Sequence, residues 1–162
     1  YAKDKLPENL LLNDFITEKV NTSVSIYNVR VYNFISDGDG IINFDKYENI
    51  EFPFNEEDKE RILKNSYVFK VLGENMQPFF IDNDIIYFTK KKFEGWEKLD
   101  RKLILVKIEN DYYIRKIYFQ KGKAFLFSFN ENVYPEKEIT DKVEFIGVLA
   151  GQLKRYVEKI KF

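Results

Sequence analysis

A corner between two predicted strands is the part of this sequence best placed to expose a reactive side chain. The alternating run Tyr67–Leu72 predicts a strand, which Gly73 interrupts and behind which Pro78 prevents a long helix. Turn-forming residues follow at 82–84, and the apolar run 85–88 predicts the next strand. A corner of this kind can hold one side chain exposed at the end of a sheet, where a nucleophile is often placed.

The amino-acid composition removes several kinds of catalytic chemistry. The 162 residues include no cysteine and no histidine, which excludes disulfides, thiolate metal sites, and Ser-His or Cys-His catalysis. There are 26 basic and 27 acidic side chains, a balance that argues against a DNA-binding surface. No apolar run approaches the ~20 residues of a membrane span, and no signal peptide is visible. We therefore expect a cytoplasmic protein that uses no cofactor and no membrane.

Short strands separated by frequent turns predict a mainly β domain over residues 26–162. Residues 1–25 are predicted to be a linker or the tail of a missing N-terminal domain; a frayed tail of the following domain is the alternative. Since the chain begins at Tyr1 and its only methionine is Met76, we expect a preceding part of the protein to be missing. The other expected elements are Ile26–Ile35, a loop at 36–40, Ile41–Phe44, a helix from Asn55 through Lys64, a hairpin of Leu103–Glu109 and Tyr112–Phe119 across Asn110-Asp111, Ala124–Ser128, Val143–Ala150 and Leu153–Glu158.

The corner resembles the Gly-Asp-Ser-Met-x-Pro motif, with its trailing Gly-Asp, of the LexA-type self-cleaving repressors. That family also includes phage repressors and UmuD-like mutagenesis proteins. Glu74 stands where the motif has Asp, and Asn83, which tolerates a left-handed backbone, stands in place of Gly. Asn75 occupies the position of the nucleophilic serine. The matching residues are Gly73, Met76, Pro78 and Asp84.

Further segments resemble the family in the same order along the chain. Residues 113–117 are similar to the strand that carries the catalytic lysine, and Arg115 occupies the lysine position. Residues 27–40 are similar to the strand and loop that these proteins cut, with Asp37 and Gly38 where the family has alanine and glycine. The last two are residues 128–135, which resemble the Ser-x-Asn-x-x-Tyr-Pro segment, and residues 143–148, which resemble the closing strand.

The resemblance implies a LexA-like C-terminal domain of short, strongly bent antiparallel strands and hairpins, with at most one or two short helices. It also implies a helix-turn-helix domain that binds DNA in the missing N-terminal part, a homodimer, and a RecA-type filament as a further partner. We expect the closing segments, with Tyr156 and Val157, to contribute to the dimer contact. The alternative is that these apolar residues complete the core of the monomer.

The substitutions at the two catalytic positions predict a pseudopeptidase. Self-cleavage in this family needs a serine hydroxyl and a neutral lysine that accepts its proton. The amide of Asn75 is not a useful nucleophile, and Arg115 keeps its proton in any protein. Lys116 cannot replace it, because neighbouring strand residues point to opposite faces. Two arrangements are open: Arg115 bonds to Asn75, or Arg115 reaches solvent.

Other interpretations remain beside the dimerisation domain of a transcriptional repressor. The chain could be a UmuD-like accessory protein or a stand-alone interaction module. An active peptidase would need an unconventional nucleophile, and Ser36, Ser66 and Ser128 lack a lysine placed for them at the corner. The Asp37–Gly40 run resembles a calcium loop, but neither register supplies the required ligands and glycine. Finally, aromatic residues on a sheet can stack on the bases of single-stranded nucleic acid, although they more often fill a β core.

Overall fold

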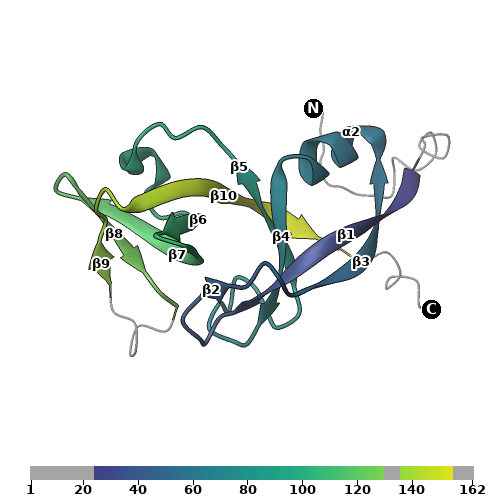
Figure 1. Ribbon diagram of the computed structural model, residues 1–162, viewed down its shortest axis with the longest axis horizontal. Coiled ribbons are helices and arrows are strands. Elements are labelled where there is room, and N and C mark those ends of the chain that lie inside the picture. The colour runs from purple at the N-terminus through teal and green to yellow at the C-terminus, as the bar shows by residue number, and fades with distance from the viewer. Residues whose placement is uncertain (1–23, 130–135, 155–162) are drawn as a thin grey trace.

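The computed structural model describes residues 24–129 and 136–154, and these residues form a mainly β domain (Figure 1). They contain one sheet of ten strands in the order β3-β1-β4-β5-β10-β6-β7-β8-β9, with β2 paired to β7 off this path. The predicted fold class is therefore confirmed. The strands are β1 Val24–Ile35, β2 Ile41–Ile42, β3 Tyr47–Asn55, β4 Ser66–Leu72, β5 Ile85–Lys90, β6 Leu103–Ile108, β7 Asp111–Gln120, β8 Lys123–Phe127, β9 Lys137–Glu138 and β10 Val143–Leu153.

One pairing departs from the antiparallel arrangement that the sequence predicts. β1 runs antiparallel to β3 but parallel to β4, where Val31 lies opposite Val68. The other strand pairs are antiparallel. Figure 1 shows β1 and β3 at one end of the molecule, β8 and β9 at the other, and β10 running between the two ends.

β10 is one long strand where the sequence predicts two extended segments. Its register shifts between Phe145 and Gly147, against β6, and between Leu149 and Gly151, against β5. A Cβ atom at Gly147 would lie 2.8 Å from the carbonyl oxygen of Thr89, so only glycine lets β10 pass this close to β5.

The pairing of β10 shows that one of the segments expected at the dimer contact belongs to the monomer's own sheet. β6 pairs with Val143–Val148 and β5 with Gly147–Leu153, so only Gly147 and Val148 are paired on both edges, and a contact of this strand with a second copy stays a prediction. The other part of that expectation, including Tyr156 and Val157, lies outside the described residues.

Buried side chains form three clusters along the sheet. The first lies on β1, β3, β4 and β5 and includes Val29 and Phe52; the second includes Phe69 and Phe88; the third, on β6, β7 and β8, includes Ile117. Phe52, Phe69 and Phe88 are among the largest fully buried side chains. Many aromatic residues therefore fill the core, as β-sheet propensity favours.

A short helix covers the first cluster and begins where the sequence predicts. Asn55 caps it, because its Oδ1 accepts a hydrogen bond of 2.7 Å from the backbone N–H of Asp58. One α-helical turn, α2 (Glu56–Asp58), continues into a π-helical turn, η1 (Lys59–Leu63). Ile62 is 5% exposed and packs into the cluster, so burial anchors the helix on the sheet.

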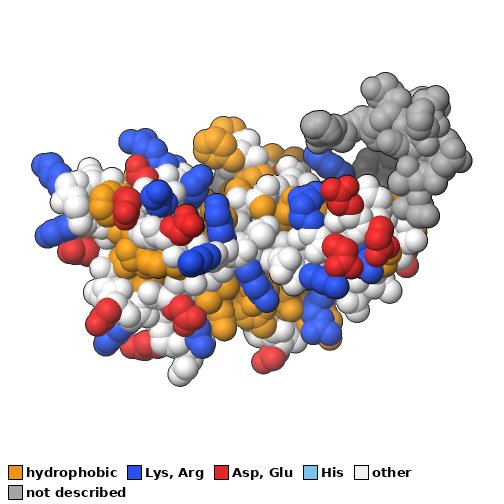
Figure 2. Space-filling model, turned by 90° about the horizontal axis from the view of Figure 1, so that it is seen from above, with side chains coloured by type: hydrophobic (Ala, Val, Ile, Leu, Met, Phe, Trp, Pro, Cys, Tyr) orange, Lys and Arg blue, Asp and Glu red, His pale blue; other side chains and the backbone are white. Residues whose placement is uncertain are grey.

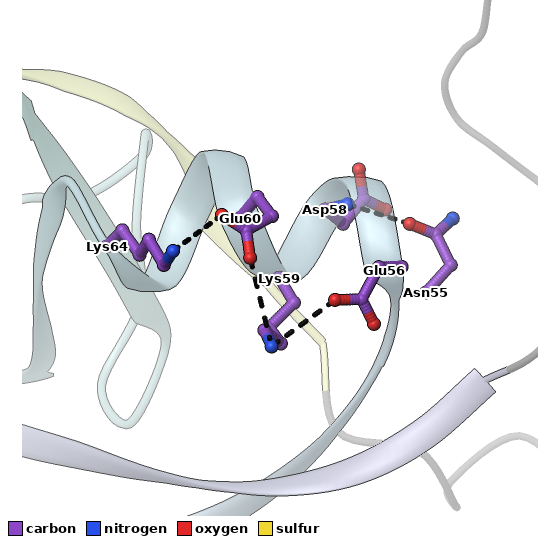
Figure 3. A network of polar contacts seen from close by, with 6 residues as sticks. All are labelled: Asn55, Glu56, Asp58, Lys59, Glu60 and Lys64. Carbon is purple, nitrogen blue, oxygen red and sulfur yellow. Dashed lines mark hydrogen bonds and ion pairs between the residues drawn. The ribbon is translucent and has the colours of Figure 1, made fainter.

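Ion pairs link side chains on the exposed side of this helix (Figure 3). Lys59 lies 3.3 Å from Glu56 and 3.8 Å from Glu60, and Lys64 lies 2.8 Å from Glu60. Exposed pairs of this kind contribute little to stability, because water and dissolved salt screen them. They support a helix that the buried face already holds in place.

Two local predictions differ from the structure in extent. Ile108 pairs with Asp111, so the β6–β7 turn is Glu109-Asn110 rather than Asn110-Asp111, and Glu109 has a φ of 59°. The extended segment predicted at Ile41–Phe44 is reduced to β2, Ile41–Ile42. Among the described residues, no helix has the length and apolar character needed to cross a membrane.

Candidate functional site

The corner, defined here as Gly73–Asp84, is closed by hydrogen bonds at its base. The backbone N–H of Val71 donates to the carbonyl oxygen of Asp84 at 2.8 Å, and that of Asn83 donates to the carbonyl of Val71 at 2.6 Å. The Asp82 carboxylate accepts from the backbone N–H of Gly73 at 2.8 Å. Asn83 has a φ of 77°, the left-handed backbone that the sequence led us to expect at this position.

Gly73 is required at the corner for two reasons. Its φ of 98° is strained for any residue with a Cβ atom, and such an atom would lie 2.8 Å from the hydroxyl oxygen of Ser36. That hydroxyl is buried; it donates to the carbonyl oxygen of Leu72 at 3.0 Å and accepts from the backbone N–H of Asn75 at 3.2 Å. The glycine therefore makes room for a serine that joins β1 to the corner.

The side chain of Asn75 connects the corner to two distant parts of the chain. Its Nδ2 donates to the carbonyl oxygen of Ser36 and to the carbonyl oxygen of Phe129, each at 3.2 Å. Ser36 begins the 36–40 loop, and Phe129 follows β8. Asn75 thus meets two segments that lie 39 and 54 residues away in the sequence.

Arg115 reaches the same loop from β7. Its Nη2 donates to the carbonyl oxygen of Asp39 at 2.9 Å, and its Nη1 donates to the carbonyl oxygen of Ile114 at 3.1 Å. The guanidinium lies 4.7 Å from the ring centroid of Tyr113 and directly against Gly40, which has a φ of 78°. A side chain at position 40 would displace the guanidinium, so Gly40 makes this contact possible.

Asn75 and Arg115 therefore hold the 36–40 loop on either side of the Asp37–Gly38 bond. Asn75 bonds the carbonyl of Ser36, one residue before that bond, and Arg115 bonds the carbonyl of Asp39, one residue after it. The loop turns tightly here, because the backbone N–H of Gly38 donates to the carbonyl of Ile35 at 3.1 Å. The three features singled out by the sequence resemblance meet at one place in the fold.

A family model described as Peptidase S24-like matches residues 30–150, a span that includes the 36–40 loop, the corner and β7. The chain belongs to this family. It is the family of LexA-like, UmuD-like and phage repressor C-terminal domains, whose activity is that of serine peptidases. A search of curated proteins found no match to the chain.

The remaining motif residues of this S24-like domain differ in their burial. Met76 is 3% exposed and lies in the second core cluster, and the carboxylate of Asp84 accepts from the backbone N–H of Ile81 at 2.9 Å. Glu74 and Pro78 are exposed. The core therefore holds Met76 in place but does not bury Pro78.

Ser36 is the site residue that sequence reasoning missed. In the sequence, Ser36 is only a small polar residue directly after a strand, which is weak evidence for a role in the site. The structure places its hydroxyl at the corner, where its partners are backbone groups of Leu72 and Asn75. Of the other two serines considered, Ser66 shares a hydrogen bond of 3.2 Å with the hydroxyl of Thr89, and Ser128 is 5% exposed.

The electrostatics of the site depend on burial more than on clustered charge. Burial raises the pKa of the Tyr113 phenol, next to the guanidinium of Arg115, and Asp111 adds to the rise. The carboxylate of Asp39 accepts from the backbone N–H of Ile41 at 3.0 Å and so stabilises the end of the loop. Within residues 24–129 and 136–154, no three His, Cys, Asp or Glu side chains lie together as a metal site would require.

Proposed function

We propose that this S24-like chain is the regulatory and dimerisation domain of a transcriptional regulator and does not cleave itself. One observation carries the proposal. The residues at the family's serine and lysine positions, Asn75 and Arg115, hold the carbonyls on both sides of the Asp37–Gly38 bond. They are hydrogen-bond donors to the loop, and neither can attack that bond.

The chemistry of the two side chains supports this proposal. Peptide cleavage by this family needs a nucleophile and a base that removes its proton. The amide nitrogen of Asn75 donates its hydrogens to two carbonyls, and the guanidinium of Arg115 does not release a proton at any physiological pH. The loss of one member of such a catalytic unit lowers the rate by about 10⁶-fold in a serine protease.

The neighbouring groups supply no obvious substitute. The backbone N–H of Asn75, a group of the kind that stabilises an oxyanion, already donates to the hydroxyl of Ser36. That hydroxyl donates to the carbonyl oxygen of Leu72, which is not a general base. Ser36 is also 1% exposed, so it acts as a buried connection between β1 and the corner.

Self-association is the second part of the proposal. A helix-turn-helix repressor reads two half-sites about one helical turn apart, so its two DNA-binding heads must be held as a pair. A surface open to such a contact lies at the end of the sheet order. The first residues of β1 present Val24 and Ile26, each 56% exposed, and β3 beside them is at the end of the sheet order. A symmetric contact of standard size would bury about 800 Å² per partner.

Mass spectrometry tests the absence of self-cleavage. The purified chain is incubated at alkaline pH, and separately with an activated RecA-type filament, and its intact mass is followed over time. We expect the mass to remain that of the whole chain. A pair of fragments that separate between Asp37 and Gly38 would refute the pseudopeptidase proposal.

Analytical ultracentrifugation over a range of micromolar concentrations tests self-association. We expect a concentration-dependent shift from monomer to dimer. Replacing Val24 and Ile26 with serine should weaken that shift, whereas replacing exposed Phe93 with serine should not, because Phe93 lies on a different part of the chain. A chain that stays monomeric at every concentration would exclude the dimerisation role.

A further inference from the structure

A cavity of about 200 Å³ lies where the connector between β5 and β6, residues 91–102, meets β10. Within the connector, η2 (Trp96–Leu99) is one short 3₁₀ turn. The connector lines the cavity on one side and β10 on the other. The side chains that concern us are Lys91, Lys92, Phe93, Lys98, Lys102 and Phe145, and we call this place the lysine pocket.

The lysine pocket concentrates positive charge on an otherwise balanced chain. The whole sequence carries 26 basic and 27 acidic side chains, but the lining of this cavity holds four lysines and one glutamate, Glu94. Within the described part of the chain, none of the four lysines forms an ion pair. Exposed like charges around one hollow raise the local concentration of anions and favour an anionic ligand.

An exposed aromatic ring stands beside these charges. Phe93 is 45% exposed, although its ring is fixed by an edge contact to Trp96, at 4.8 Å between centroids, and by Phe145 at 5.9 Å. A ring that is held by neighbours and still open to solvent can accept a flat partner at little cost in conformational entropy. Figure 2 looks down on the side of the molecule where Figure 1 places the connector, and it shows blue basic side chains beside exposed orange ones.

We propose that the lysine pocket binds single-stranded nucleic acid, with the lysines on the phosphates and a base stacked on Phe93. Positive charge along a groove together with an aromatic platform is the combination that binds single strands without sequence preference. No arginine lines the cavity, so the two-pronged recognition of carboxylates that arginine provides to acidic peptides is lacking here. The pocket is separate from the 36–40 loop, so this binding does not depend on whether the chain cleaves itself.

The binding experiment has a built-in optical probe. Trp96 is the only tryptophan in the sequence, and it touches Phe93, so a base that stacks there should change its fluorescence. The full chain is titrated with a fluorescently labelled oligothymidine of 20 nucleotides at about 50 mM and about 200 mM salt, with anisotropy and tryptophan emission both recorded. We expect saturable binding that weakens with salt, because counterions are released from the strand.

Matched variants assign the binding to the pocket. Lys91→Ala with Lys92→Ala should weaken binding at low salt by about tenfold and lower the salt slope by about 1.4, since each phosphate contact to a single strand contributes roughly 0.7. Phe93→Ala should weaken binding by about tenfold with the salt slope unchanged, and Phe93→Tyr should bind as the parent does. The control pair Lys121→Ala with Lys123→Ala removes the same charge from the exposed β7–β8 turn and should leave binding intact.

Each contrary result overturns the proposal. Absence of binding at 50 mM salt would do so, as would an equal loss in the control pair, which would mean that general charge attraction explains the binding. Tighter binding of a polyglutamate peptide than of oligothymidine would assign the pocket to acidic peptides. Circular dichroism of each variant checks that it is folded, and the exposure of the replaced lysines makes unfolding unexpected.

Discussion

The polar side chains of the 36–40 loop and those of the lysine pocket differ in whether they have partners within the chain. At the loop, Ser36, Asn75 and Arg115 each donate to backbone carbonyls, and the contacts join segments far apart in the sequence. In the lysine pocket, lysines surround a hollow and, in the described part of the chain, form no ion pair. The first arrangement is that of polar groups used for structure; the second is that of charge available to a partner.

This difference shows that a position in a family motif does not decide what a residue does. Asn75 and Arg115 occupy positions where the family places its chemistry, yet their observed contacts are those of two anchors for one loop. The lysine pocket belongs to none of the segments that carry the resemblance, yet it combines charge and an open aromatic ring. The following predictions test how far this contrast holds.

The largest effect is expected from restoring the missing chemistry at the loop. Asp37→Ala, Asn75→Ser and Arg115→Lys together supply the family's target residue, nucleophile and base, at the place where the loop already lies. We expect cleavage between residues 37 and 38, with a rate that exceeds the parent's by up to about 10⁶-fold. The fragments are measured by mass spectrometry across pH 7–10.

Two partial variants serve as controls for this gain. Asn75→Ser alone should stay intact, because Arg115 cannot accept the serine proton. The triple variant with Ser36→Ala added should still cut, since Ser36 has a structural role. If Ser36→Ala abolished a cleavage that the parent already showed, the site would be an active one with an unconventional nucleophile.

The second effect compares two apolar residues of the same corner. Met76 is 3% exposed and Phe79 is 79% exposed. Met76→Ala should lower the free energy of unfolding by about 2–5 kcal/mol, because it leaves a cavity in the core, while Phe79→Ala should change it by less than about 0.5 kcal/mol. Urea denaturation measures both. Equal losses would mean that the corner packs differently from the structure described.

The third effect contrasts one cation from each region. Arg115→Met leaves the carbonyl of Asp39 without its charged donor and should cost about 1–3 kcal/mol of unfolding free energy. Lys102→Met removes the same charge from the lysine pocket, where no ion pair is lost, and should change stability by less than about 0.5 kcal/mol. The measurement is again urea denaturation. A larger loss for Lys102→Met would show that the pocket lysines have a structural role.

Local features of this fold could be predicted because the sequence specifies them over short distances. The strands β1 and β4, the start of the helix at Asn55 and the turn at Asn83 depend on neighbouring residues and were found where expected. The order of the family-like segments also placed Asn75 and Arg115, and both proved to contact the 36–40 loop.

The features that sequence reasoning missed depend on contacts between distant segments. The parallel pairing of β1 with β4 and the placement of β10 between β5 and β6 leave no local signal in the chain. The role of Ser36 becomes visible only when the corner is folded against the end of β1. The lysine pocket also forms between distant segments, because the connector meets Phe145 of β10 there. The near-zero net charge of the whole chain gave no indication of this local cluster of lysines.

The smallest effect separates the half-buried phenol of Tyr67, near the core, from a phenol introduced at an exposed position of the lysine pocket. Burial raises the pKa of Tyr67 above its ordinary value of 10.0, and the nearby phenols Tyr112 and Tyr32 add to the rise. Below about pH 10 this phenol is neutral in both the folded and the unfolded chain and does not affect stability. As the pH rises past 10, the Tyr67 phenol ionises first in the unfolded chain, so the folded state loses stability until the pH passes the folded pKa.

Tyr67→Phe should therefore reduce the loss of unfolding free energy between pH 8 and pH 10.5, measured by urea denaturation. Phe93→Tyr adds a phenol at an exposed position, where water solvates both states alike, and should leave that loss as it is in the parent. If Phe93→Tyr steepened the loss instead, the ring at the lysine pocket would be buried in solution, and the contrast between the two regions would fail there.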